Sequence, residues 1–239
     1  MSSLADTFGL LAFDGGWGWN LLRGLASTVQ IALGAFALGL VIGLGGALGK
    51  LHGGTALRWL LELYTTLIRA VPELVLILLL YYAGTQLVNE ALMSFGRRPI
   101  DISGLVAGIA VLGVVQGAYA TEVIRGAMRA VPHGQLEAAA AFGMGALTRL
   151  RRIAIPAAIP YALPGLANLW LIVLKDTALL AVVGFSELAL TTRQAAGSTR
   201  AYFFFFAVAA LIYLALTLVS NAVFGLLERR ARRGQPALA

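Results

Sequence analysis

A few polar side chains interrupt the long apolar runs of this chain, where they could meet a polar solute. Three are spaced so that they share one helix face, and three lie within or at the end of a later run: Gln116, Tyr119 and Glu122, then Asn168, Lys175 and Asp176. Such side chains are costly in a membrane and by default mark functional pathways. We predict a polar pathway here. The alternatives are hydrogen bonding between helices for Gln116 and Asn168, and an ion pair with Arg125 for Glu122.

The residues of common catalytic sites are missing from the sequence. It contains no cysteine, which excludes thiolate metal sites and cysteine nucleophiles. His52 and His133 are its only histidines, and they cannot form a His-Glu-x-x-His zinc motif. Neither a Gly-x-Ser-x-Gly nucleophile turn nor a Gly-x-x-x-x-Gly-Lys-Ser/Thr phosphate loop occurs. These absences argue against an intramembrane enzyme and against nucleotide binding through such a loop.

The composition is typical of a membrane protein. Hydrophobic residues make up 59% and charged residues 12% of the 239 residues, and the mean hydropathy is +0.85. Soluble domains contain about 25% charged residues, so an ordinary soluble enzyme, a disordered chain and a nucleic-acid module are excluded. The net charge is +7. Because the basic residues separate apolar runs, we attribute this charge to membrane orientation.

Five apolar runs are long enough to cross a membrane as helices, for which about 20 residues are needed. The chain is therefore predicted to be an all-α polytopic membrane protein with five transmembrane helices, at residues 21–48, 72–88, 102–124, 157–174 and 202–227. In the first of these, Ala35, Gly39 and Gly43 recur at four-residue spacing. Small residues in this pattern allow close helix packing, either against another subunit or within one bundle.

The segments between the spans carry further expectations. We predict an interfacial helix at 57–70, a partly re-entrant segment at 176–190 and a loop at 191–200. Prolines break or kink helices, and three of them are expected to do so at the start of the fourth span: Pro156, Pro160 and Pro164.

The distribution of basic residues predicts the orientation, because cytoplasmic segments are enriched in Lys and Arg. One side of the five-span arrangement holds eleven: Lys50, Arg58, Arg125, Arg129, Arg149, Arg151, Arg152, Arg229, Arg230, Arg232 and Arg233. The other side holds four: Arg97, Arg98, Arg193 and Arg200. The N-terminal segment 1–20 is therefore predicted to be periplasmic, and the basic tail 228–239 cytoplasmic.

The long basic segment 125–152 contains a compact helix that a free loop would not need. Pro132 can begin it, and Gly143 can end it with a positive φ. The residues between them are small, rich in alanine and nearly neutral. A short helix of this kind is suited to insertion into a groove of a partner protein.

The residues of this segment carry a specific resemblance. Glu137-Ala138-Ala139, Gly143, Ile153 and Pro156 match the pattern E-A-A-x3-G-x9-I-x2-P of the EAA loop of ABC-importer permeases at each of its positions. Residues 118–126, 130–137 and 175–184 resemble the polar amino-acid permeases. Residues 64–76 and 161–165 resemble in particular the histidine/lysine/arginine/ornithine and opine permease subunits.

This resemblance implies a type I ABC importer permease fold over residues 21–227, in the inner membrane of a bacterium. The segment 132–156 would be its coupling loop, with a cytoplasmic coupling helix in which Glu137 and Gly143 are the main positions. The other interpretation of Glu137 is a solvated surface carboxylate. The implied partners are two copies of an ATP-binding subunit, a second permease subunit (a related chain or a second copy), a periplasmic solute-binding protein and membrane lipid, but no nucleic acid. No cofactor is expected in this chain, since ATP and Mg belong to the ATP-binding subunits.

The resemblance also indicates the cargo, which would be basic amino acids or opines such as arginine, histidine, lysine, ornithine, octopine or nopaline. Neutral or acidic amino acids are the alternative for the same kind of permease. A stand-alone carrier or channel is the alternative from another class, and the absence of a clear internal repeat argues against the repeat-built carriers.

Overall fold

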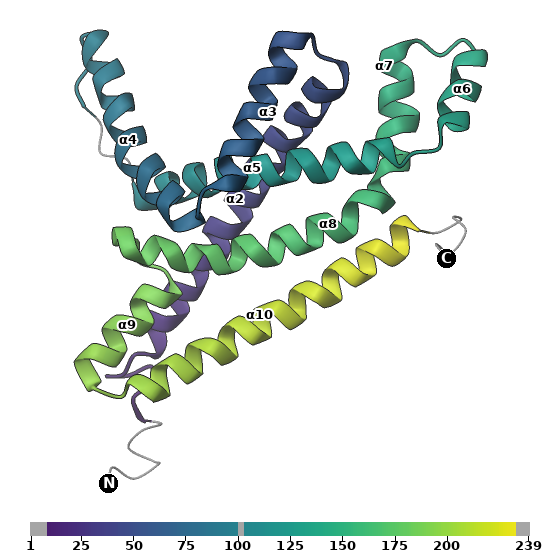
Figure 1. Cartoon of the computed structure of the whole chain (residues 1–239). Coiled ribbons are helices and arrows are strands. Elements are labelled where there is room, and N and C mark those ends of the chain that lie inside the picture. Colours follow the sequence, from purple (N-terminus) through teal and green to yellow (C-terminus); the bar gives the residue numbers. More distant parts are fainter. Residues whose placement is uncertain (1–8, 100–102, 233–239) are drawn as a thin grey trace.

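The computed structural model describes residues 9–99 and 103–232, and the regular secondary structure of these residues is helical throughout. Figure 1 shows long helices joined by shorter ones. The long ones are α2 (Gly18–His52), α4 (Glu73–Ser94), α5 (Gly104–Arg129), α8 (Ile155–Asp176) and α10 (Tyr202–Ala231). The shorter ones are α3 (Thr55–Ala70), α6 (His133–Ala141), α7 (Ala146–Arg149) and α9 (Leu188–Thr199), with a π-helical turn η1 at Leu150–Ala154 and a 3-10 helix η2 at Thr177–Val183.

The five predicted spans are confirmed. Within the described residues, five helical stretches are long and apolar enough to cross a membrane: α2, α4, α5, the stretch Ala146–Val183 that contains α8, and α10. Each helix ends beyond its predicted span, because an apolar run marks the hydrocarbon core whereas the helix continues into the polar interface. Thus α2 begins inside the predicted N-terminal segment 1–20, and α10 continues into the predicted tail 228–239. Residues 1–8 and 233–239 lie outside the described residues.

The helices α2 and α5 pack along each other at the centre of the molecule and make the most extensive contact among the described elements (Figure 1). α8 packs on α5, α10 lies along α8, and α9 contacts both α10 and the start of α2. One buried cluster joins α2, α4, α5, α8 and η2, and includes Ile31, Ile77, Leu112, Leu174 and Leu180. The hairpin of α6 and α7 projects from this body at the end opposite α9 (Figure 1).

Glycines of α2 bring its backbone against α5 of the same chain. A Cβ on Gly39 would lie 2.9 Å from the Cβ of Gln116, and one on Gly46 would lie within 3 Å of the Thr121 side chain. Residues further along α2 contact residues further along α5, so the two helices run in the same chain direction. Of the two interpretations of the Ala35–Gly43 pattern, packing within one bundle is therefore the one observed.

The prediction of a loop at 191–200 is wrong, because residues 191–199 belong to helix α9 and only Arg200 lies beyond its end. The Glu187 carboxylate caps the helix by accepting hydrogen bonds from the backbone N–H groups of Ala189 (2.8 Å) and Leu190 (2.6 Å). Thr191 and Thr192 are buried and donate to carbonyl groups one turn earlier. Their polarity, which suggested a loop, is thus satisfied inside the helix itself.

Of the predicted break or kink at the three prolines, the break is wrong, since α8 is continuous from Ile155 to Asp176 with Pro160 and Pro164 inside it, and the kink stays a prediction. The irregularity lies one turn earlier, in η1, where the N–H of Ile155 bonds to the carbonyl of Leu150. A π-helical turn of this kind widens the helix just before Pro156, the second residue of α8. Proline has no backbone N–H, and near the start of a helix this missing donor is tolerated.

The segments predicted around the second and fourth spans are helical. α3 confirms the helix predicted at 57–70, and its interfacial position stays a prediction. The side chain of Leu61 packs against Gly49, so α3 returns along the end of α2. The segment predicted as re-entrant, 176–190, contains η2 and then a left-handed turn at Gly184 (φ +88°) that leads into α9.

Candidate coupling loop and polar pathway

The short helix predicted between Pro132 and Gly143 is present as α6. Pro132 precedes it with φ −58°, and Gly143 follows it with φ +77°. The N–H of Gly143 bonds to the carbonyl of Ala140 (2.9 Å), and that of Met144 to the carbonyl of Ala139 (3.1 Å). A residue in the left-handed conformation after the helix allows the following N–H groups to bond to the last carbonyl groups of the helix. Glycine adopts that conformation without strain. Gly143 therefore sets the sharp turn toward α7.

The outer surface of α6 is free of contacts within the described residues. Glu137 and Ala138 are exposed, Phe142 is 86% exposed, and only Ala139 of the predicted motif residues on α6 is buried. Within residues 9–99 and 103–232, no hydrogen bond or ion pair holds the Glu137 carboxylate. The helix thus presents a small apolar surface with one carboxylate, which suits a groove of another protein.

The remaining motif residues lie where the loop returns to the membrane part. Ile153 is half-buried in η1, and Pro156 is exposed at the start of α8. α6 packs against η1 and α7. A hollow of about 520 Å³ lies between α6, α7 and the end of α2, and it is lined by His52, His133, Glu137 and Arg149 among others. The end of α2 therefore lies across this hollow from the hairpin of α6 and α7, which we call the coupling hairpin after the role predicted for it.

Two of the predicted pathway residues come together with a carboxylate that the sequence analysis did not select. Tyr119 of α5 donates a hydrogen bond to Glu73 of α4 over 3.4 Å. Asp176, at the end of α8, is near enough to both to interact electrostatically. This polar cluster of Glu73, Tyr119 and Asp176 draws on three helices. The signal that could have selected Glu73 is a carboxylate next to a long apolar run, because such groups at membrane depth are functional candidates by default.

Of the other predicted pathway residues, Lys175 interacts electrostatically with Asp176, whereas Gln116 and Asn168 take no part in this cluster. Gln116 is 3% exposed, and its Nε2 donates to the carbonyl of Leu169 over 2.5 Å, which is the interhelical hydrogen bond considered as its alternative role. Asn168 is exposed on α8, and Lys175 is exposed next to Asp176. The sequence could not separate these cases, because a polar residue in an apolar helix can face a neighbouring helix or the surface equally well.

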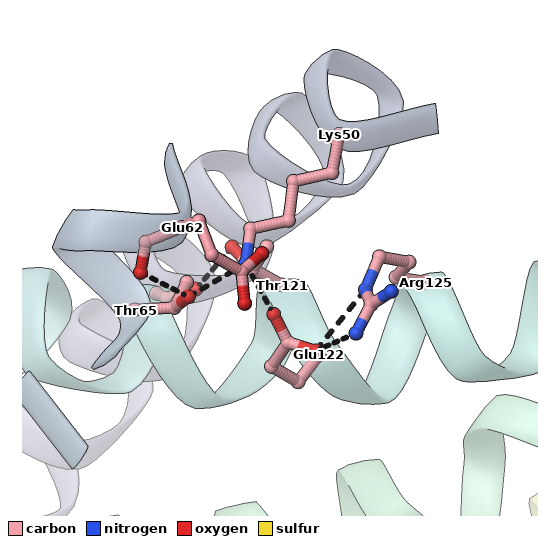
Figure 2. A network of polar contacts seen from close by, with 7 residues as sticks. Lys50, Glu62, Thr65, Thr121, Glu122 and Arg125 are labelled. Carbon is pink, nitrogen blue, oxygen red and sulfur yellow. Dashed lines mark hydrogen bonds and ion pairs between the residues drawn. The ribbon is translucent and has the colours of Figure 1, made fainter. Parts of the chain in front are cut away.

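A partly buried ion-pair network joins α2, α3 and α5 (Figure 2). Lys50, 4% exposed, donates from Nζ to Glu62 (2.7 Å), Thr65 (2.6 Å) and Glu122 (2.6 Å). The other carboxylate oxygen of Glu122 pairs with Arg125, as the sequence alternative for Glu122 predicted. The sequence analysis missed Lys50, because its partners lie 12 to 72 residues away and no local pattern links them.

Comparison with known proteins adds to this geometry. Residues 36–233 match the protein family described as binding-protein-dependent transport system inner membrane component. The histidine/lysine/arginine/ornithine transport system permease protein HisQ of Salmonella typhimurium is 46% identical over 215 residues, covering 90% of this chain and 94% of that protein. The octopine transport system permease protein OccQ of Rhizobium radiobacter is 42% identical over 220 residues, covering 92% and 93%.

The fold is similar to a solved structure as well. A crystal structure of an amino acid ABC transporter with histidines superposes with a TM-score of 0.75 at 32% identity, covering 90% of this chain and 95% of that one. The similarity extends over α2 to α10 rather than over a single element. The hairpin of α6 and α7 and the polar cluster thus lie within the part of the chain that known relatives share.

Proposed function

The chain belongs to the family of binding-protein-dependent transport system inner membrane components, and we propose that it imports basic amino acids or opines as one pore subunit of an ABC transporter. It is a permease subunit, and its relatives are the permease subunits of amino-acid and opine transporters. The predicted fold class, a five-helix ABC importer permease, is confirmed. The observation that carries the proposal is the similarity to these relatives over nine-tenths of the chain.

We propose that α6 is the coupling helix and that separate ATP-binding subunits hydrolyse ATP. Support comes from the uncovered outer surface of α6, from the turn at Gly143 and from the absence of a phosphate loop in the sequence. In this proposal Glu137, Ala138 and Ala139 lie in a groove of the ATP-binding subunit, and Gly143, Ile153 and Pro156 shape the return to the membrane. ATP and Mg bind in that partner, of which the complex holds two copies.

We propose that the cargo passes the polar cluster. A cationic side chain that leaves water needs acceptors, and Glu73 and Asp176 supply two carboxylates beside the Tyr119 hydroxyl. Lys175, next in sequence to Asp176, offers a donor for the cargo carboxylate. Gln116 and Asn168 remain members of the predicted pathway only if the helices rearrange during transport. Two carboxylates favour a cationic cargo over an acidic one, and a neutral amino acid is the alternative.

The orientation proposed for the inner membrane has the N-terminus in the periplasm and the C-terminus in the cytoplasm. The excess of eleven basic residues over four supports it. It places α6 on the side where ATP is available. A periplasmic solute-binding protein would then deliver cargo at the end of the molecule that carries α9. The second pore subunit is a related chain or a second copy.

Transport assays on the complete complex test this function. The complex is reconstituted in liposomes with its ATP-binding subunit, and uptake of radiolabelled arginine is measured with the loaded binding protein, with and without internal ATP. We expect uptake that requires both ATP and binding protein and that unlabelled octopine or histidine reduces. Competition by glutamine or glutamate alone would overturn the cationic cargo. Uptake without ATP would indicate a stand-alone carrier instead.

A further inference from the structure

Among the described residues, the chain connects the coupling hairpin to the membrane part at its two ends. α5 leads into α6 through residues 130–132, and α7 with η1 leads from it into α8. α6 itself packs only against α7 and η1 among its substantial contacts. Any displacement of α6 therefore enters the membrane part through α5 or α8.

α5 connects the coupling hairpin with the polar cluster. Tyr119 lies one turn before Glu122, and the helix ends at Arg129, about 10 Å further along at a rise of about 1.5 Å per residue. A displacement of the end of α5 would reach Tyr119 only if the helix moves as a body with its neighbours. The contacts that hold α5 to its neighbours near Glu122, which we call its bracing, thus decide how much of a displacement of α6 reaches Tyr119.

The Lys50 ammonium supplies that bracing. An ammonium has three N–H donors, and here all three are used, two by α3 (Glu62, Thr65) and one by α5 (Glu122) (Figure 2). A buried ammonium is stable only while paired and hydrogen-bonded. If α5 separated from α2 here, the Lys50 ammonium would lose its partner Glu122. The three helices are therefore held to one another at this point.

Two neighbouring features fit the same role. One turn before Lys50, Gly46 lies against the side chain of Thr121 of α5, so the two helices are already in close contact where the ion pairs begin. Two residues after Lys50, His52 lines the hollow shared with His133 and Glu137 of α6. The end of α2 thus faces the hairpin of α6 and α7 across this hollow.

We infer that Lys50 is a positioning residue for transport: it joins the cytoplasmic ends of α2, α3 and α5 into one body, so that movement of α6 reaches the polar cluster. This inference rests on the proposed coupling role of α6. Because Lys50 is buried and its ammonium is bonded to side chains of this chain, it acts through Glu122 and α5. A network that served stability alone would affect the amount of complex but not the cargo moved per ATP.

The measurement that separates these roles is the ratio of cargo uptake to ATP hydrolysis, taken in the same liposomes with the loaded binding protein. The variants are Lys50→Met, Glu122→Gln and the double variant, with Glu90→Gln as control, an exposed carboxylate on α4 that bonds only to Gln86 of its own helix. We expect the ratio to fall about fivefold or more in each single variant, which is the lower end of coupling between distant sites. The double variant should be no worse than Lys50→Met, because the two residues act as a unit.

An unchanged ratio in Lys50→Met or Glu122→Gln, with lower activity in proportion to assembled complex, would overturn the inference. If these variants do not assemble, Glu62→Gln decides, because the Glu62 side chain is 60% exposed and we expect its replacement to disturb folding least. A smaller fall in the ratio is then expected, and no fall overturns the inference. The proposed function itself fails differently: the unaltered complex would then show no hydrolysis stimulated by the binding protein.

Discussion

Gly43 of α2 lies so close to Ala120 of α5 that a Cβ at residue 43 would be 2.5 Å from the Cβ of Ala120. It would also be 2.9 Å from the Ala120 carbonyl carbon, so the obstacle includes backbone that cannot rotate away. The centre of the fold therefore depends on a missing side chain. Gly45, two residues on, is exposed and would place a Cβ in open space.

This contrast predicts that Gly43→Ala destabilises the protein and that Gly45→Ala does not. Extra atoms in a tightly packed site cost about 1–3 kcal/mol, whereas alanine in an open helical position is favoured over glycine by up to about 1 kcal/mol. Thermal unfolding in detergent should show a lower Tm for Gly43→Ala and an equal or higher Tm for Gly45→Ala. Equal Tm values in both would contradict the packing of α2 on α5.

The buried Glu187 cap predicts a second stability difference. Its carboxylate accepts from two backbone N–H groups at the start of α9 and lies 3.4 Å from the hydroxyls of Thr28 and Tyr213. Glu187→Ala should lower the free energy of unfolding by about 1–3 kcal/mol, because buried donors lose their partner. Glu90→Ala, on the exposed surface of α4, should have little effect. Similar Tm values for the two variants would show that α9 does not need this cap.

The elements that could be predicted from the sequence are those that depend on residues close together in the chain. α6 was predicted from Pro132 and Gly143, because both residues act on their own turn of backbone. The five spans were predicted because hydrophobicity adds up along one helix. α9 was missed, since Thr191 and Thr192 satisfy their hydroxyls within the helix and face the bundle.

Within the candidate site, the same distinction holds. The motif residues from Glu137 to Pro156 fall on consecutive elements, so their spacing alone located them. The Lys50 network and the contact of Tyr119 with Glu73 join residues far apart in sequence. Such contacts depend on how helices cross, which no spacing in a single sequence encodes.

The orientation can be tested with single cysteines, because the natural chain contains none and background labelling is absent. Arg98, Gly145 and Gly197 are exposed, so a cysteine at each would be reachable from its own side. In intact cells with a permeabilised outer membrane, an impermeant maleimide should label Arg98→Cys and Gly197→Cys but not Gly145→Cys. The reverse labelling pattern would place α6 in the periplasm and reject the proposed orientation.

The polar cluster predicts a specific transport defect. Asp176→Asn removes one of the two carboxylates proposed to meet the cationic cargo. A hydrogen bond to a charged group contributes about 1.5–3 kcal/mol, so arginine uptake should fall about tenfold or more. Hydrolysis stimulated by the loaded binding protein should persist, because the coupling hairpin is untouched. If uptake, hydrolysis and assembled complex fall together, Asp176 is structural and the cluster is no cargo site.

The proposed coupling role of α6 is tested most directly by Gly143→Val, compared with Gly145→Val. Gly143 has φ +77°, a conformation that a β-branched residue rarely adopts, whereas Gly145 is extended and open. With both variants inserted in the membrane at equal amounts, ATP hydrolysis stimulated by the binding protein is measured in the reconstituted complex. We predict that Gly143→Val loses this stimulation and that Gly145→Val keeps it. Normal stimulation in Gly143→Val would contradict the assignment of α6 as the coupling helix.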